Sequence, residues 1–107
     1  MIVISKYFDI SWDMDIQYEK SIRILKALSD ENRIQILSLL KNNELCACVL
    51  QENLNLSQSG LSYHMKILIN SGLVDSRQEG KWTHYKINEK NAKEAIDIFK
   101  KILNQNN

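Results

Sequence analysis

The 107-residue sequence contains no proline, only three glycines and only two cysteines. It has no long apolar run, so we expect no membrane span. No glycine-rich phosphate loop, serine–histidine–aspartate group or pair of carboxylates stands out, which argues against an enzyme. Apart from the polar tail at 104–107, we find no low-complexity segment, and no internal repeat. A chain of this length fits one domain over residues 1–107, with a modest core of the kind that dimerisation often stabilises.

The N-terminal stretch carries no recognisable targeting signal. Its short apolar start has no basic region before it and soon turns acidic, so we do not expect a signal peptide. The two cysteines are spaced as Cys46-x-Cys48. Without a secretion signal, this cysteine usage predicts reduced thiols in the cytoplasm.

Charge is unevenly distributed along the chain. The net charge of +1 argues neither for nor against nucleic acid as a partner. Acidic residues gather before residue 20, whereas basic residues outnumber acidic ones from Ser57 to Lys90. This basic bias is mild, and it is weaker than the patch that marks many nucleic-acid-binding domains.

Residues 1–17 allow two interpretations. Apolar and polar residues alternate from Ile10 to Gln17, which favours an extended arm or an edge strand. The polar members include Asp13 and Asp15, which are poor strand formers, so a helix start is equally compatible. The structure of this N-terminal arm therefore stays open.

Three helices are predicted between Tyr18 and Asn55. The first ends at residues 29–31, where Asp30 can cap the second helix. Asn43 can cap a third helix that starts at Glu44. The apolar stripes of the first two helices consist of Tyr18, Ile22, Leu25 and Leu28, and of Ile34, Ile36, Leu37 and Leu40.

The stretch from Leu56 to Gly72 has the pattern of one capped helix with two faces. Ser57 occupies the N-cap position, and Gly72 follows the last periodic residue. An apolar stripe of Leu61, Met65, Leu68 and Ile69 lies on one face. The other face carries hydrogen-bonding or cationic residues that suit the edges of bases and a phosphate in a major groove, namely Gln58, Ser59, Ser62, Tyr63 and Lys66.

This stretch alone is more typical of an ordinary amphipathic surface helix than of a DNA-reading one. The short helix and polar turn before it, however, complete a helix-turn-helix. His64, at the margin of the apolar stripe, is expected to be a packed or hydrogen-bonded residue and not a metal ligand.

Two β-prone runs flank Glu79-Gly80 and predict a hairpin directly after this helix. A hairpin in this place is a wing. Arg77 and Lys81 near its tip are well placed for phosphate contacts. His84 is expected on the strand surface, and Trp82 has no role that the sequence assigns.

Residues 91–105 predict a C-terminal helix that Asn91 can cap. Its continuous apolar stripe needs a partner, either its own core or a second copy across a two-fold axis. We favour a dimer in which this helix pairs with the first helices. The predicted fold class is therefore mainly α with a β-hairpin wing, a homodimeric winged helix-turn-helix.

Five segments carry a family resemblance: ALSDENRIQIL, ELCACVL, LSQSGLSYHMKIL, SGLV and EGKWTHYKIN. Over residues 22–88 the chain closely resembles the ArsR family of metal-responsive winged-helix repressors, and ELC-x-C resembles its arsenic-sensing branch. The resemblance implies a homodimer that binds an inverted-repeat operator in double-stranded DNA. It also implies release when arsenite or antimonite binds the thiolates of Cys46 and Cys48, with no cofactor required.

The chain departs from the family pattern in its set of metal ligands. Gln51 stands where some members have a third cysteine, so trivalent arsenic would need hydroxide, water or a small thiol as its third ligand. The last predicted helix lacks histidine, which removes the zinc site of other branches. Residues two apart diverge by roughly 200° in a helix. We therefore expect that one ion reaches both thiolates only if the helix start unwinds, which would distort the DNA-reading pair of helices.

Other hypotheses remain open. The cysteines alone are compatible with small buried hydrophobes. A repressor of this kind could instead respond to thiol oxidation or to another soft metal ion. A small dithiol redox protein would need Cys-x-x-Cys near a βαβ unit, and the chain has neither. A pure dimerisation module would leave the wing without a purpose.

Overall fold

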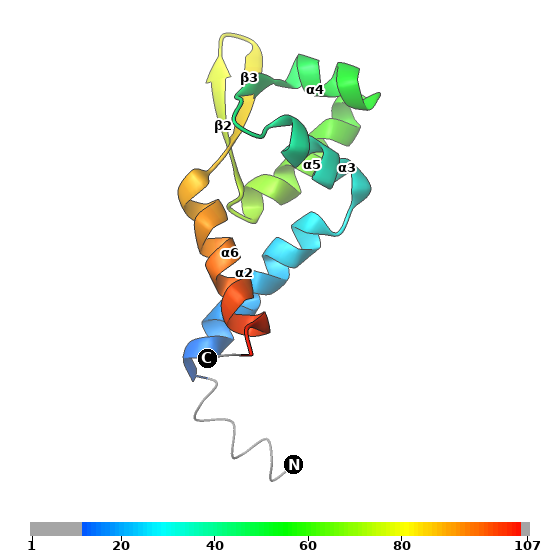
Figure 1. Cartoon of the computed structure of the whole chain (residues 1–107). Coiled ribbons are helices and arrows are strands. Elements are labelled where there is room, and N and C mark those ends of the chain that lie inside the picture. Colours follow the sequence, from blue (N-terminus) through cyan, green and yellow to red (C-terminus); the bar gives the residue numbers. More distant parts are fainter. Residues whose placement is uncertain (1–11, 106–107) are drawn as a thin grey trace.

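The computed structural model describes residues 12–105, with side chains described from residue 18 onward. It is mainly helical, with a small antiparallel sheet, as predicted. The elements in chain order are α2 (Trp12–Leu28), α3 (Glu31–Leu39), β1 (Leu45–Cys46), α4 (Ala47–Leu54), α5 (Gln58–Asn70), β2 (Val74–Glu79), β3 (Trp82–Ile87) and α6 (Glu89–Leu103). Figure 1 shows α3, α4, α5 and the hairpin at one end of the molecule, with α2 and α6 side by side at the other.

The N-terminal interpretation is resolved in part. Helix α2 already includes residues 12–17, so of the two alternatives for this segment the helix is correct and the extended arm is wrong. Residues 1–11 lie outside the described residues. No helix between Trp12 and Leu103 combines the length and the apolar content that crossing a bilayer requires.

The buried faces of α2 and α3 differ from the predicted stripes. In α2 the core is reached by Ser21, Ile24 and Ala27, while the predicted Tyr18, Ile22 and Leu25 are each close to half exposed. In α3 the inward residues are Arg33 and Ile36, followed by Leu40, and Ile34 is 45% exposed. Helical periodicity identified an apolar row on each helix, but the row on α2 faces away from this chain's own core.

The helix-turn-helix is built from α4 and α5, and local caps define its second helix. Ser57 is the N-cap of α5, and its hydroxyl accepts a hydrogen bond from the Gly60 N–H at 3.0 Å. Leu61, Met65 and Leu68 are buried as predicted, whereas Ile69 is 37% exposed.

Helix α5 ends at Asn70, and the glycine that follows its C-cap Ser71 would be difficult to replace. Gly72 has a φ of +86°, a conformation that disfavours side chains, and an added Cβ would approach the Asn91 amide nitrogen to 3.3 Å. The Asn91 side chain donates a hydrogen bond to the Gly72 carbonyl at 2.9 Å. Asn91 therefore ties α6 to the end of α5.

Helix α6 begins two residues earlier than predicted, at Glu89. Its N-cap is Asn88, whose side-chain oxygen accepts a hydrogen bond from the Asn91 N–H at 2.9 Å. The prediction that Asn91 caps this helix is wrong, because Asn91 is already inside the first turn and is committed to Gly72.

The hairpin is confirmed, and a third strand joins it. Strands β2 and β3 pair antiparallel on either side of a turn at Gly80 and Lys81. The two-residue strand β1 pairs with the other edge of β3, which gives the order β1-β3-β2. The predicted wing is thus connected by a sheet to the segment just before α4.

Replacing Leu68 with alanine should test how α5 is held in place. Leu68 is fully buried, so Leu68→Ala should lower the free energy of unfolding by about 2–5 kcal/mol. Its neighbour Ile69 is the matched control, because this side chain is 37% exposed and Ile69→Ala should cost less than about 1 kcal/mol. Urea denaturation followed by circular dichroism measures both. Equal losses would mean that α5 is packed in a different rotation.

Candidate thiol site and nucleic-acid interface

The two cysteines lie where β1 ends and α4 begins. Cys46 pairs with His84 of β3 and is also the N-cap of α4, with φ −70° and ψ 146°. Its sulfur accepts a hydrogen bond from the Cys48 N–H at 3.3 Å. Both are free thiols, Cys46 half-buried and Cys48 exposed.

The predicted start of this helix is wrong. A helix from Glu44 capped by Asn43 is prevented because Leu45 and Cys46 are extended and paired with β3. The two cysteines are therefore not both helical, and the divergence of roughly 200° does not apply to them. With α4 intact, the Cys46 sulfur already accepts a hydrogen bond from the N–H of Cys48.

The two thiols shift each other's pKa in opposite directions. The Cys48 thiol donates a hydrogen bond to the Cys46 sulfur, and this bond lowers the pKa of Cys46, with a further contribution from the Cys48 N–H. The same bond raises the pKa of Cys48, because it holds the proton on that sulfur. Cys46 is thus the first thiolate of the pair, and it lies at a helix N-terminus, which also favours negative charge.

The thiol pair supplies two soft ligands and no more. Within the part of the chain that the structure describes, no group of three or more His, Cys, Asp or Glu residues is arranged to hold a metal ion. Gln51, in place of a third cysteine, lies one turn along α4 from Ala47 and lines the same cavity as Cys48. A three-coordinate ion at this pair would therefore need one ligand from solution.

A cavity of about 130 Å³ joins the thiol site to the helix-turn-helix and the wing. Cys48 and Gln51 of α4 line one side of it, Gln58 and Ser62 of α5 line another, and Lys81 comes from the turn of the hairpin. Three of the predicted DNA-binding residues thus share this small cavity with a cysteine.

The outward face of α5 presents the predicted base-reading residues. Gln58, Ser59, Ser62, Tyr63 and Lys66 are all exposed, on the side away from the buried Leu61, Met65 and Leu68. Such a row on the second helix of a helix-turn-helix has the polarity and access that a major groove requires.

The two predicted phosphate contacts of the wing differ from each other. Lys81 is exposed in the turn, with its ammonium 5.9 Å from the centre of the half-exposed Trp82 ring. Arg77 lies in β2, where its guanidinium donates to both carboxylate oxygens of Glu44 and to Glu79 at 2.6 Å. These partners raise the pKa of Arg77 and lower the pKa of both carboxyl groups. Arg77 would have to leave two carboxylates before it could bind a phosphate.

One structural residue escaped the sequence-based prediction. Arg33 is 8% exposed, and its guanidinium donates to the carbonyls of Lys26 and Ala27 and to Nδ1 of His64 at 3.0 Å. His64 is therefore a packed, hydrogen-bonded residue, as predicted, and its Nδ1 is the acceptor. The signal in the sequence was the spacing of Arg33 from Ile36 and Leu40, which places the three on one helix face.

Comparison with known proteins agrees with this geometry. Residues 30–76 match the model of the arsR family of bacterial regulatory proteins. An arsenical resistance operon repressor from Staphylococcus aureus is 40% identical over 92 residues, which cover 86% of this chain and 88% of that one. HlyU of Vibrio cholerae, a transcriptional activator, is 36% identical over 95 residues, which cover 89% and 88%.

The solved structure of reduced HlyU from Vibrio cholerae superimposes with a TM-score of 0.68 at 35% identity, over 87% of this chain and 98% of that one. The likeness therefore extends over most of the chain. The chain belongs to the ArsR family, and it is a winged helix-turn-helix DNA-binding transcriptional regulator and not an enzyme.

Proposed function

We propose that this protein is a homodimeric repressor that leaves its operator when trivalent arsenic or antimony binds Cys46 and Cys48. The observation that carries the proposal is the shared cavity: Cys48 lines it together with Gln58, Ser62 and Lys81. A ligand on the thiol pair would lie next to side chains on both parts of the proposed DNA surface. The names of the arsenical resistance repressors among its relatives support the same inducer.

The chemistry of the pair suits a soft, three-coordinate ion. Thiolates select soft ions over the harder ions that prefer oxygen ligands. Arsenous acid can exchange two of its hydroxyl groups for the two thiols and release two molecules of water, so the proton on Cys48 leaves as part of one water. The third position keeps a hydroxyl or takes a small thiol from solution. The lowered pKa of Cys46 favours this thiol in the first of these exchanges.

Release does not require α4 to unwind. An ion bound to both thiols would link the extended Cys46 to Cys48 in the first turn of α4, and so restrict the angle between β1 and the helix. It would also press on the wall between α5 and the wing. A tenfold to hundredfold loss of DNA affinity needs a coupling of only about 1.4–2.7 kcal/mol.

In the DNA complex we propose that α5 lies in the major groove. Gln58, Ser59, Ser62 and Tyr63 then reach base edges, while Lys66 and Lys81 contact phosphates. Arg77 is the weaker candidate for phosphate, because Glu44 and Glu79 already hold it.

The homodimer is proposed from the surface that α2 and α6 leave exposed. The two helices pack on each other, and apolar side chains remain on their outer side. These are Tyr18, Ile22 and Leu25 of α2 and Ile96, Ile102 and Leu103 of α6, each at least 45% exposed. Burial of such a row against a second copy would place two α5 helices in one molecule, as an inverted repeat requires.

The first experiment is arsenite titration of the protein bound to its own upstream DNA. Wild type should lose DNA affinity by tenfold or more, and Cys46→Ser combined with Cys48→Ser should keep it, because serine offers no soft ligand. Fluorescence anisotropy of labelled DNA under reducing conditions measures this. If peroxide but not arsenite releases the protein from DNA, the signal is thiol oxidation and not a metalloid. Equal response of both proteins to arsenite would remove the thiols from the mechanism.

Substitution of Lys81 should report on phosphate contact by the wing. Lys81→Gln should weaken binding to all DNA sequences and reduce the slope of log K against log salt by about 1 per subunit. Lys41 is a matched control, since it is exposed in the turn after α3, on no element of the proposed DNA surface. Binding isotherms at several salt concentrations measure both variants. An unchanged slope for Lys81→Gln would remove this residue from the interface.

A charge placed in the proposed dimer surface should separate the subunits. Ile96→Glu should shift the protein from dimer to monomer, because a carboxylate buried between apolar faces has no partner there. Ile34→Glu is the matched control, since Ile34 is 45% exposed on α3. Analytical ultracentrifugation across a range of concentrations distinguishes them. A monomeric wild type, or a dimeric Ile96→Glu, would contradict the assignment of this surface.

A further inference from the structure

We infer that the Glu44–Arg77 ion pair, which acts as a tie between the thiol segment and β2, is the contact through which a ligand on Cys46 and Cys48 displaces the wing. In this scheme Arg77 binds Glu44 and does not bind a DNA phosphate. The inference rests on the proposed function and adds to it a route from the thiol site to β2. Arg77 and Glu44 are positioning residues in this scheme, since neither touches the ligand.

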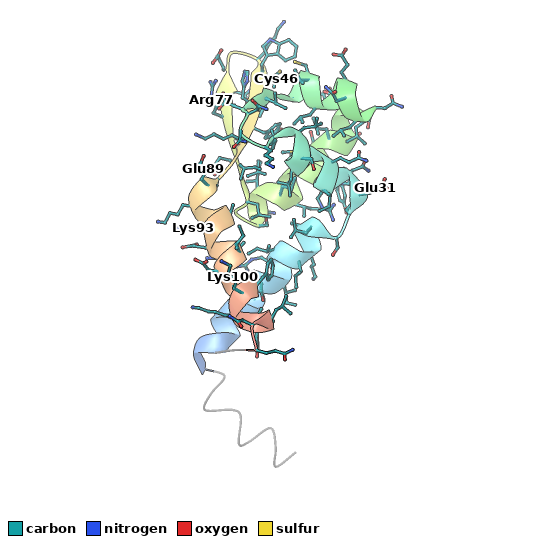
Figure 2. All side chains as sticks on the ribbon, viewed as in Figure 1. Glu31, Cys46, Arg77, Glu89, Lys93 and Lys100 are labelled. Carbon is teal, nitrogen blue, oxygen red and sulfur yellow. The ribbon has the colours of Figure 1, made fainter. Side chains whose placement is uncertain are left out.

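The segment that carries the sensor residue is attached to both strands of the hairpin. In the sheet register, Cys46 of β1 and Arg77 of β2 are both opposite His84 of the central strand β3. Arg77 and Cys46 lie at the same end of the molecule, beside the hairpin (Figure 2). Glu44 precedes Cys46 by two residues, so along an extended chain the two side chains point to the same side. The Glu44–Arg77 pair therefore connects the residue just before β1 to β2, the strand on the other side of β3.

The geometry of this pair is directional. Arg77 Nε is 3.0 Å from each carboxylate oxygen of Glu44, and Nη2 is 2.6 Å from one of them. A guanidinium bound through two nitrogens constrains the orientation of its carboxylate as well as its distance, which a lysine would not do. Movement of Glu44 is therefore passed to β2.

The charges argue against a second role for Arg77 at phosphate. Its guanidinium is paired with Glu44 and Glu79 at once. Lys81, by contrast, has no carboxylate at ion-pair distance among residues 18–105, and it lies in the exposed turn. Lys81 can thus meet a phosphate without first breaking an ion pair.

A bridge between the two thiols would act directly on this tie. Cys46 is the last residue of β1 and the cap of α4, so a change in the angle between strand and helix moves β1. Strand β1 is only two residues long and pairs only with β3. The Glu44–Arg77 pair provides the additional attachment to β2, and through it the whole hairpin follows β1. Exposed ion pairs contribute little to stability, so removal of this one should leave the fold intact.

The test compares the arsenite-induced change in DNA affinity, expressed as the ratio of Kd with and without arsenite, in the full-length protein. Glu44→Gln and Arg77→Gln should each reduce this ratio about three- to fivefold, and the double variant should be no worse than either single one. Glu79→Gln is the matched control, because it removes one carboxylate from Arg77 but keeps the pair with Glu44. Its ratio should stay within twofold of wild type. The exchanged pair, Glu44→Arg with Arg77→Glu, should recover most of the ratio.

Three results would overturn the inference. If Glu44→Gln strengthens DNA binding and steepens its salt dependence, then release from Glu44 has made Arg77 a phosphate ligand. If wild type responds to arsenite and both single variants keep its full ratio, the tie carries no coupling, although the proposed function stands. If Glu79→Gln reduces the Kd ratio as much as Glu44→Gln does, the effect arises from the loss of any negative charge near Arg77 and not from the Glu44–Arg77 pair.

A second measurement tests the Glu44–Arg77 tie independently of DNA release. It applies even if arsenite fails to release the wild-type protein from DNA, a result that would refute the proposed function. Phenylarsine oxide bridges neighbouring thiols and can be added without DNA. Hydrogen exchange should then change in β1, α4 and β2 of wild type, but only in β1 and α4 of Glu44→Gln. An equal change in β2 of both proteins would refute the tie.

Discussion

The pairing of Leu45 and Cys46 with β3 is the constraint on which the thiol site depends. It keeps the chain extended through Cys46, so α4 can begin only at Ala47 and Cys46 becomes its cap. One cysteine is therefore in a strand and the other in the first turn of a helix, and the sulfur of the first accepts a hydrogen bond from the N–H of the second. The same pairing connects the thiol site to the hairpin, because β3 is also the partner of β2. A helix that began at Glu44 would have turned the thiols apart and left the wing as a separate two-stranded ribbon.

The features that sequence reasoning predicted correctly are those whose partners lie within a few residues. The caps at Asp30 and Ser57 and the turn at Gly80 are closed by atoms two or three positions away, so residue type and spacing are sufficient to predict them. The buried and exposed faces of α5 followed from helical periodicity in the same way. The sequence also predicted that the polar row on α5 is exposed, and it is, but it did not predict that Cys46 ends a strand and caps α4. The roles of these residues in binding stay predictions.

The features that were missed depend on contacts between distant parts of the chain. Strand β1 is two residues long and forms only because β3, almost forty residues later, offers an edge. Arg33 and His64 are 31 positions apart, and Glu44 and Arg77 are 33 apart. No local pattern distinguishes an exposed arginine from one held by such a partner. In α2, periodicity revealed an apolar row but could not tell a row that faces the chain's own core from one that would face a second copy.

The proposed sensing mechanism needs only modest energies, and the architecture is suited to that. The proposed coupling of about 1.4–2.7 kcal/mol is comparable to a few exposed ion pairs or a single buried hydrogen bond to a charged group. A close-packed core can transmit such an effect, because it has low compressibility, but surface contacts offer a second route. Here the cysteines, the start of α5 and the hairpin turn border one cavity, and an ion pair crosses the sheet beside it. A displacement at Cys46 therefore has a short path to the wing over surface contacts, while the buried residues under α5 can stay where they are.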